Sequence, residues 1–206
     1  MPALAVAAAL RSGCPVADGV FDRMFPPELR FISFQHWTPV AVARRAAELL
    51  VQAGARRVLD VGAGPGKFCI VGALTTNASF TGIERRAELV EVAREAAERS
   101  GAARALFFHA NAVRFPFDHF DGFYFYNPFY EQLNPGLLQI DETSSHSVVF
   151  FRRCVQTARA KLASLPKGTT VATYHGLGGE MADGYRRVHQ ENAGDGVLAL
   201  WTKVGT

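Results

Sequence analysis

Residues 58–66 read Val-Leu-Asp-Val-Gly-Ala-Gly-Pro-Gly, and this stretch decides the fold of the chain. It begins as a short apolar strand with Asp60 near its end, and glycines at 62, 64 and 66 then form a turn before an apolar helix. Glycines at a strand-to-helix turn let the backbone approach a ligand closely. The spacing is G-x-G-x-G. It differs from the dinucleotide fingerprint G-x-G-x-x-G, because Lys67 stands at the third glycine position, and Phe68 excludes a phosphate-binding P-loop.

Residues 60–66 resemble motif I of the class I S-adenosylmethionine-dependent methyltransferases. In that family the turn wraps the methionine end and the sugar of the cofactor. The resemblance therefore implies S-adenosyl-L-methionine as the cofactor, bound in part by Asp60, Gly62, Ala63, Gly64 and Gly66. The turn alone leaves open a glycine-rich turn in another kind of α/β domain.

The composition predicts a folded protein with a sizeable core. Hydrophobic residues make up 49% of the 206 residues and charged residues 20%, which excludes global disorder. A net charge of +3 does not by itself indicate a nucleic-acid or membrane surface.

The cysteines and the N-terminal apolar segment suggest where the protein works. The three cysteines lie far apart and lack zinc-ligand spacing, so we expect no disulfide framework and no metal site. The apolar segment 3–10 is too short to span a bilayer and lacks the charge order of a secretory signal. We therefore expect a cytoplasmic protein with a short N-terminal helix and no membrane association.

The order of elements predicts an α/β fold. Strands are expected at 57–61, 79–84, 105–109, 122–126, 169–174, 185–191 and 197–204. Helices follow the first, second and fourth of these strands, which implies parallel pairing. The last two flank Gly194-Asp195-Gly196, a hairpin turn signal. We expect a doubly wound, seven-stranded, mostly parallel sheet with an antiparallel C-terminal hairpin, which is the class I methyltransferase pattern. One domain is expected over 1–206, with 1–37 as an N-terminal helical cap and 38–206 as the cofactor-binding core.

Polar residues follow the strands of this predicted sheet, where ligands of open α/β sheets bind. Glu84 lies about 20 residues beyond the glycine turn, the spacing at which a carboxylate reaches ribose hydroxyls. The alternative for Glu84 is a surface residue that opens the next helix. By resemblance to motif III, Asn111 and Ala112 are expected at the adenine. Arg85, the neighbour of Glu84, is also expected to contact the cofactor. Asn111 could instead cap its own turn.

Residues 126–130, Tyr-Asn-Pro-Phe-Tyr, resemble the [DNS]-P-P-[YFW] motif of methyltransferases that act on amino or amide nitrogens. The resemblance implies that Asn127 and the carbonyl of Pro128 accept the amino hydrogens, beside the cofactor methyl group. Phe129 or Tyr130 would stack on the plane of the substrate. Phe129 stands where the motif has its second proline, and Asn-Pro is also an ordinary strand terminator.

Residues 34–39 resemble the aromatic-Thr-Pro segment that lies over the methionine end of the cofactor in amino-methyltransferases. Trp37 and Thr38 are the candidates there. The pair Thr38-Pro39 also predicts a helix start, with the hydroxyl as N-cap and proline at the first helical position. Among the scattered histidines, His175 at the end of the fifth strand is the best placed for acid–base chemistry, although methyl transfer from a sulfonium often needs no strong base.

These features together favour an S-adenosylmethionine-dependent methyltransferase that acts on an unidentified acceptor, with nitrogen as one candidate. The alternatives are an NAD-dependent oxidoreductase and a non-catalytic S-adenosylmethionine-binding module. The acceptor could be a protein, a nucleic acid or a small molecule, because fold does not determine substrate. Residues 12–37 and 128–146 are the segments available for its recognition, and the sequence leaves the oligomeric state open.

Overall fold

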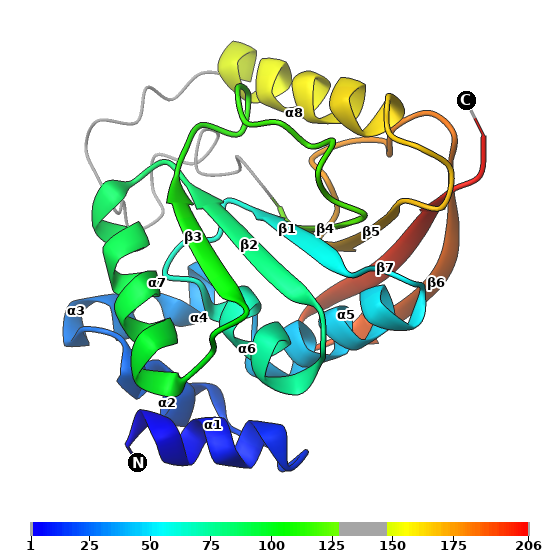
Figure 1. Cartoon of the computed structure of the whole chain (residues 1–206). Coiled ribbons are helices and arrows are strands. Elements are labelled where there is room, and N and C mark those ends of the chain that lie inside the picture. Colours follow the sequence, from blue (N-terminus) through cyan, green and yellow to red (C-terminus); the bar gives the residue numbers. More distant parts are fainter. Residues whose placement is uncertain (1, 128–147, 206) are drawn as a thin grey trace.

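The computed structural model describes residues 2–127 and 148–205 (Figure 1). Its strands are β1 Arg57–Val61, β2 Ser79–Glu84, β3 Ala105–His109, β4 Gly122–Tyr126, β5 Thr170–Tyr174, β6 Tyr185–Ala193 and β7 Gly196–Lys203. Its helices are α1 Ala3–Arg11, α2 Asp18–Phe21, the 3-10 helix η1 Asp22–Met24, α3 Pro27–Arg30, α4 Ser33–His36, α5 Val40–Gln52, α6 Lys67–Thr75, α7 Ala87–Ser100 and α8 Val148–Ala163.

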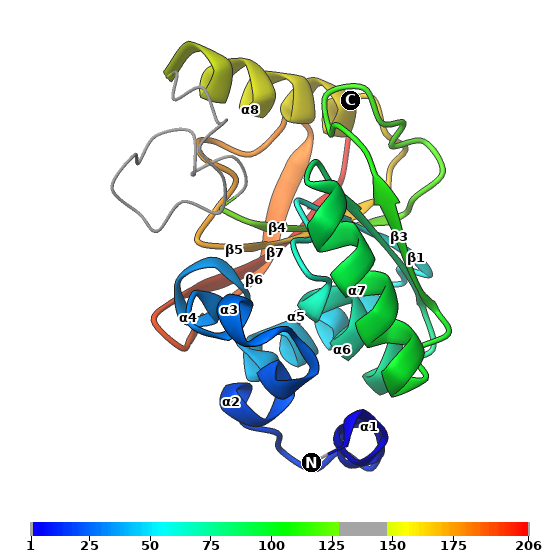
Figure 2. The same cartoon turned by 90° about the vertical axis from the view of Figure 1, so that its left-hand side faces the viewer.

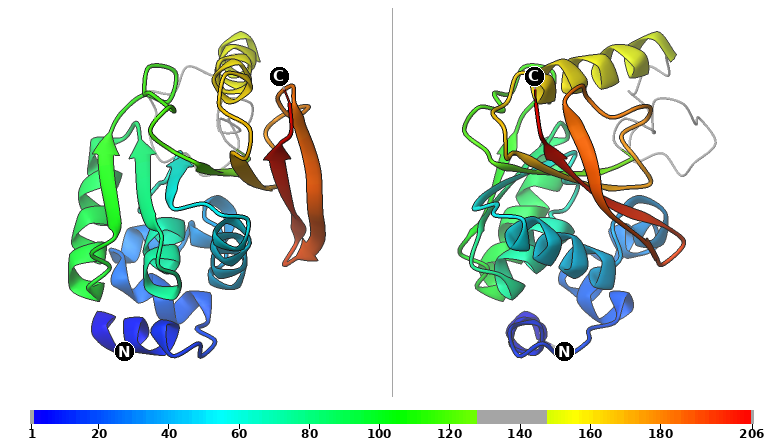
Figure 3. Two further views of the ribbon diagram at one scale, coloured as in Figure 1. Left: turned by 45° about the vertical axis from the view of Figure 1, so that its right-hand side comes forward. Right: turned by 90° about the vertical axis from the view of Figure 1, so that its right-hand side faces the viewer.

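The strands form one seven-stranded sheet in the order β3-β2-β1-β4-β5-β7-β6. The pairs among β1 to β5 are parallel, whereas β7 is antiparallel to both β5 and β6. The expected doubly wound sheet with an antiparallel C-terminal hairpin is therefore confirmed. Figure 3 shows β3 at one edge of the sheet and the β6–β7 hairpin at the other.

Helices cover both faces of the sheet (Figures 1 and 2). One face packs against α5, α6 and α7, and the other packs against α8. Strand residues alternate between the two sides, as the two-residue period of a strand requires. In β1, Val58 belongs to the hydrophobic cluster on the α5–α7 side, and Leu59 and Val61 belong to the cluster on the α8 side.

Helix α6 is apolar on all sides because every side of it is covered. All of its residues from Lys67 to Leu74 are buried. A Cβ on Gly72 would lie 2.5 Å from the ring of Phe80 in β2, so the helix approaches the sheet closely. This close contact sets the position of the glycine turn that precedes the helix.

An ion pair joins the β6–β7 hairpin to helix α5. Arg45 on α5 donates to both carboxylate oxygens of Glu191 on β6, at 2.8 and 3.0 Å. This pair lowers the pKa of Glu191 to about 2. The hairpin edge is thereby held beside the first long helix.

The predicted N-cap of the first long helix is wrong. The helix begins at Val40, and the Thr38 hydroxyl makes no capping bond. It pairs instead with the Tyr124 hydroxyl at 2.7 Å. The backbone N–H of Val40 donates to Oδ1 of Asp18, at 2.9 Å, so a carboxylate distant in sequence caps α5. Burial of Tyr124 makes a hydroxyl partner necessary, which takes Thr38 away from the helix end.

Candidate active site

The glycine turn between β1 and α6 is closely packed on one side and open on the other. The N–H groups of Gly62 and Ala63 both donate to the carbonyl of Ile83 at the end of β2, at 3.0 Å. Gly62 and Gly66 have φ near +84°, a conformation that favours glycine. A Cβ on Gly66 would lie 2.5 Å from the Phe107 ring, whereas a Cβ on Gly62 would meet no heavy atom within 4 Å.

Glu84, at the carboxyl end of β2, holds this turn. Its side chain is buried, and its Oε2 accepts a hydrogen bond from the N–H of Gly64 at 3.1 Å. Its Oε1 accepts from the N–H groups of Arg85 and Arg86, both at 2.9 Å, and from Nε of Arg86 at 3.1 Å.

The distribution of these bonds decides what else Glu84 can hold. A carboxylate offers about four acceptor positions. Oε1 is saturated, while Oε2 keeps capacity beside the open side of the turn. Oε2 can therefore accept one further hydrogen bond. Glu84 also takes part in the start of the next helix, as in the alternative considered from the sequence, but as a buried residue and not a surface one.

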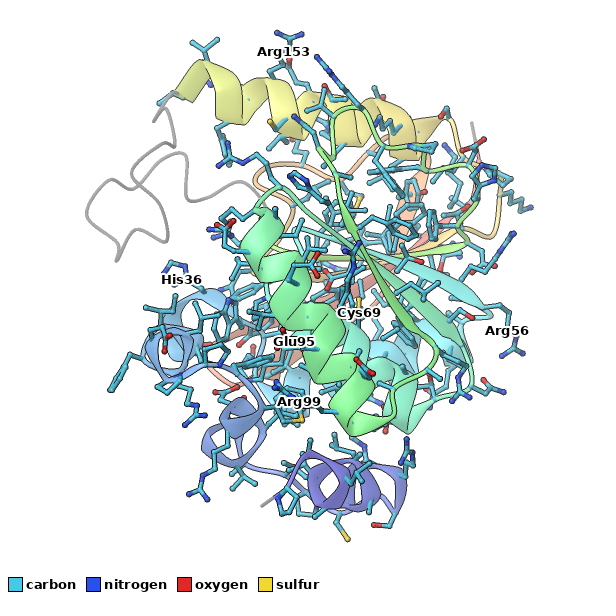
Figure 4. The ribbon with its side chains drawn as sticks, turned by 60° about the vertical axis from the view of Figure 1, so that its left-hand side comes forward. His36, Arg56, Cys69, Glu95, Arg99 and Arg153 are labelled. Atoms are coloured by element: carbon cyan, nitrogen blue, oxygen red, sulfur yellow. The ribbon has the colours of Figure 1, made fainter. Side chains whose placement is uncertain are left out.

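Asp60 is the other buried carboxyl group near the turn. It lies on the α6 side of β1, and Sγ of Cys69 donates to its Oδ2 at 3.6 Å. Figure 4 shows Cys69 in the interior of the molecule, while Arg56 and Arg153 extend outward. Burial, with a smaller contribution from the neighbouring charge of Glu84, raises the pKa of Asp60 to about 7. Among the described residues, its hydrogen-bond partner is Cys69, a buried residue of α6. Asp60 therefore lies on the buried side of the turn.

The aromatic-Thr-Pro segment lies against the glycine turn. Trp37 is buried, and a Cβ on Gly64 would lie 3.3 Å from its indole Nε1. Thr38 is joined to Tyr124, whose ring stacks on Phe68 of α6 with centroids 3.8 Å apart. The structure thus brings Trp37 and Thr38 to the helix and turn that motif I forms.

The predicted adenine side lies beyond the neighbouring strand β3. Its Asn111 is exposed, and its Oδ1 accepts from the N–H of Val113 at 2.9 Å. Asn111 therefore caps its own turn, the second possibility noted from the sequence. The turn is close to Glu84, because the N–H of Ala110 donates to the Glu84 carbonyl at 2.9 Å. Ala112 follows, with its carbonyl accepting from Nζ of Lys161 at 2.9 Å.

Two residues with left-handed backbone conformations lie side by side at the ends of β4 and β5. Asn127 has φ +36° and His175 has φ +57°, and they are the only non-glycine residues with positive φ in the described part of the chain. The N–H of Asn127 donates to the carbonyl of Tyr174 at 3.1 Å. Such conformations are costly for L-residues and gather at functional sites. Pro128, Phe129 and Tyr130 lie outside the described residues.

Next to this pair, Asp195 of the hairpin turn organises an aromatic cluster. Its Oδ1 accepts from the Tyr174 hydroxyl at 2.7 Å and lies 3.5 Å from Nε2 of His175. The His175 ring lies 5.7 Å from the ring of Tyr126. Burial and then the bond to Asp195 raise the pKa of Tyr174. The sequence indicates Asp195 only as a turn residue, because its partners lie at the end of β5.

Lys67, the first residue of α6, is a second residue whose role the sequence does not indicate. Its ammonium group is buried between two aspartates of the N-terminal helices. A charged residue at the start of an apolar helix was the available signal, but its aspartate partners lie 45 and more residues away.

Two further features bear on the site. Within residues 2–127 and 148–205, no group of three or more His, Cys, Asp or Glu side chains could hold a metal ion. Over the same residues, none of the helices has the length and apolar composition needed to cross a membrane.

Comparison with known proteins identifies the family. A protein-family model described as a methyltransferase domain matches residues 53–162, which contain the glycine turn, Glu84, Asn111 and Asn127. A search of curated proteins finds no match.

Solved structures with the same fold include several methyltransferases. An RNA methyltransferase from Salinibacter ruber in complex with S-adenosyl-L-homocysteine has a TM-score of 0.59 and 22% identity, covering 82% of this chain and 94% of its own. An O-methyltransferase from Bacillus cereus has a TM-score of 0.60 and 13% identity, covering 97% of each chain. A putative O-methyltransferase from Klebsiella pneumoniae has a TM-score of 0.58 and 16% identity, covering 98% of this chain and 97% of its own. At these identities the likeness concerns the fold.

Proposed function

The chain belongs to the methyltransferase domain family, and we propose that it transfers a methyl group from S-adenosylmethionine to an acceptor nitrogen held at the carboxyl end of β4. The observation that carries the nitrogen assignment is the place of Asn127, which has a left-handed backbone with φ +36° at the end of the strand that pairs with β1. Because β1 leads directly into the glycine turn, Asn127 lies at the same edge of the sheet as the proposed cofactor site.

The residues around the turn fit S-adenosylmethionine. The open space in front of Gly62 and the acceptor capacity of Glu84 Oε2 support a sugar and its hydroxyls at this place. The rest of the turn, Ala63, Gly64 and Gly66, with Trp37 against it, would enclose the methionine end. When bound, S-adenosylmethionine supplies an electrophilic methyl group on a sulfonium that leaves as a neutral thioether.

The remaining assignments complete the proposed cofactor site. Asn111 and Ala112 would meet the adenine, with the Asn111 side-chain NH₂ available because its oxygen is engaged by Val113. Arg85 follows Glu84, and its carbonyl accepts from Nε2 of His109 at 2.9 Å. Asp60 and Thr38 would support the turn from its buried side, through their contacts with buried residues.

The chemistry required of the protein is mainly orientation. A nitrogen lone pair must point at the methyl carbon for in-line transfer, and misplacement by about 1 Å costs about a hundredfold in rate. The side-chain oxygen of Asn127 can accept an N–H of the acceptor and so direct its lone pair. By resemblance to the amino-methyltransferase motif, the Pro128 carbonyl would accept a second hydrogen, and Phe129 or Tyr130 would stack on the substrate.

Variants of Asn127 separate this role from a structural one. Asparagine, aspartate and glycine tolerate positive φ, whereas alanine costs about 1–2 kcal/mol there. Asn127→Asp keeps both the conformation and an acceptor oxygen. Asn127→Gly keeps the conformation alone. Asn127→Ala loses both.

The assay is methyl transfer from labelled S-adenosylmethionine to cell extract, followed by isolation of the labelled acceptor. With that acceptor, we expect Asn127→Asp to retain more activity than Asn127→Gly, and Asn127→Gly to lose about a hundredfold in rate without losing stability. Cofactor affinity should stay nearly constant. Full turnover by Asn127→Gly would remove the nitrogen assignment, because the backbone alone would then explain the residue.

A further inference from the structure

The strongest unexplained feature outside the proposed acceptor site is a buried ion-pair cluster around Lys67. Nζ of Lys67 lies 2.6 Å from Oδ1 of Asp18 and 2.8 Å from Oδ1 of Asp22. It also donates to Oγ of Ser33 at 3.3 Å, and it lies 5.6 Å from the ring centroid of Phe21.

Burial distinguishes this cluster from the surface ion pairs of the protein. The side chains of Lys67 and Asp22 are 3% and 7% exposed. Two buried charges lose their hydration, so such a pair is not explained by stability alone, although removal of one partner is destabilising. The two aspartates and the serine together satisfy the ammonium donors.

The position of Lys67 on its helix also points away from a purely local role. It is the first residue of α6, immediately after Gly66. A cation at a helix N-terminus opposes the helix dipole. The lysine therefore destabilises its own helix end, and the aspartates on α2 and η1 offset that cost.

Asp18 extends the cluster to α5. Oδ1 of Asp18 accepts both from Lys67 and from the N–H of Val40, at 2.6 and 2.9 Å. Residues 18–38 are thus held at both ends, because Asp18 anchors the start and the Thr38 hydroxyl pairs with Tyr124 at the end. Between these anchors lies Trp37, whose indole packs on Gly64 of the turn.

We propose that Lys67, Asp18 and Asp22 form a clamp that fastens residues 18–38 over the glycine turn, so that cofactor affinity depends on a cluster that does not touch the cofactor. This inference rests on the proposed cofactor site. Lys67 is a positioning residue, because it acts through the placement of Trp37. By linkage, cofactor binding must stabilise the clamped segment to the same extent that the clamp strengthens cofactor binding.

The test uses Asp22→Asn and Asp18→Asn in the full chain. Both variants keep a side-chain oxygen for Lys67, and the other aspartate still balances its charge, so we expect folded protein. The matched control is Asp183→Asn, which makes the same chemical change in an ion pair with Arg159, on a side chain that is 93% exposed. The readouts are calorimetric affinity for S-adenosylhomocysteine and hydrogen exchange of the backbone amides.

We expect Asp22→Asn to weaken S-adenosylhomocysteine binding by about tenfold, an ordinary size for coupling between sites. Amides of residues 18–38 should exchange faster in this variant, while β4 and β5 keep their protection. In the wild type, S-adenosylhomocysteine should slow exchange in the same segment. Asp183→Asn should change neither readout.

Two results would overturn the inference, and they are distinguishable. Faster exchange over 18–38 with unchanged affinity would show that the cluster only stabilises the N-terminal helices. A wild-type chain that binds no S-adenosylhomocysteine would overturn the proposed cofactor site and the clamp with it. If Asp22→Asn yields no folded protein, Asp18→Asn decides the question, since its side chain is 47% exposed and tolerates change better.

Discussion

Replacement of Glu84 by glutamine tests the cofactor site most sharply, because the expected loss can be worked out bond by bond. The glutamine oxygen can replace either Oε1 or Oε2. Facing the N–H groups of Arg85 and Arg86, it keeps three of the four hydrogen bonds. Its NH₂ group then faces the N–H of Gly64, which loses its acceptor.

A buried donor without a partner costs about 1–3 kcal/mol, and we expect the free energy of unfolding to fall by this amount. Since domains of this kind are stable by about 5–15 kcal/mol, the variant should remain folded. A ribose hydroxyl would lose its charged acceptor as well. We therefore expect affinity for S-adenosylhomocysteine to fall by a further 1–3 kcal/mol, or about 5- to 150-fold.

Denaturant titration gives the stability of Glu84→Gln, and calorimetry with S-adenosylhomocysteine gives its affinity. The control is Glu95→Gln, on the outer side of α7 in Figure 4, where the carboxylate is 65% exposed and lies 3.7 Å from Arg99. This control should change neither quantity. A Glu84→Gln protein with reduced stability and wild-type affinity would refute the ribose assignment, and Glu84 would then only join the turn to α7.

Further predictions concern the turn and the buried carboxyl group behind it. Gly62→Ala places its Cβ in open space, so it should cost about 1–2 kcal/mol in stability but remove cofactor binding. Gly66→Ala meets the Phe107 ring as well, so denaturant titration should show a larger loss, about 2–5 kcal/mol. Burial raises the pKa of Asp60 from 3.8 to about 7. Below pH 3.8 Asp60 is protonated in both the folded and the unfolded chain, and its contribution to the free energy of unfolding is complete. As the pH rises to about 7 the unfolded chain loses this proton first, so the free energy of unfolding falls by at most about 4 kcal/mol. In denaturant titrations from pH 4 to 8, Asp60→Asn should make the free energy of unfolding less dependent on pH. The same pH dependence in this variant as in the wild type would contradict the raised pKa of Asp60.

The sheet and the glycine turn could be predicted because their signals are local. Short apolar strands end at glycine or polar residues, and the spacing from Gly64 to Glu84 follows from one strand–helix–strand unit. The antiparallel hairpin was predicted from Gly194-Asp195-Gly196, a turn signal within three residues.

Contacts between distant segments could not be predicted in this way. The Thr38 hydroxyl pairs with Tyr124, 86 residues further along the chain, and this partner overrides the local preference for a helix cap. Asp18 caps α5 from 22 residues before it. The proximity of His175 to Asp195 likewise depends on the register between β5 and β7. Side chains of this kind acquire their roles only when the sheet brings the strand ends together.

The central claim is that the turn over residues 62–66 binds S-adenosylmethionine, and calorimetry of the wild-type chain tests it most directly. We predict that S-adenosylhomocysteine binds, and that NAD binds at least about tenfold more weakly, a difference of about 1.4 kcal/mol. Tight binding of NAD together with no binding of S-adenosylhomocysteine would contradict the account.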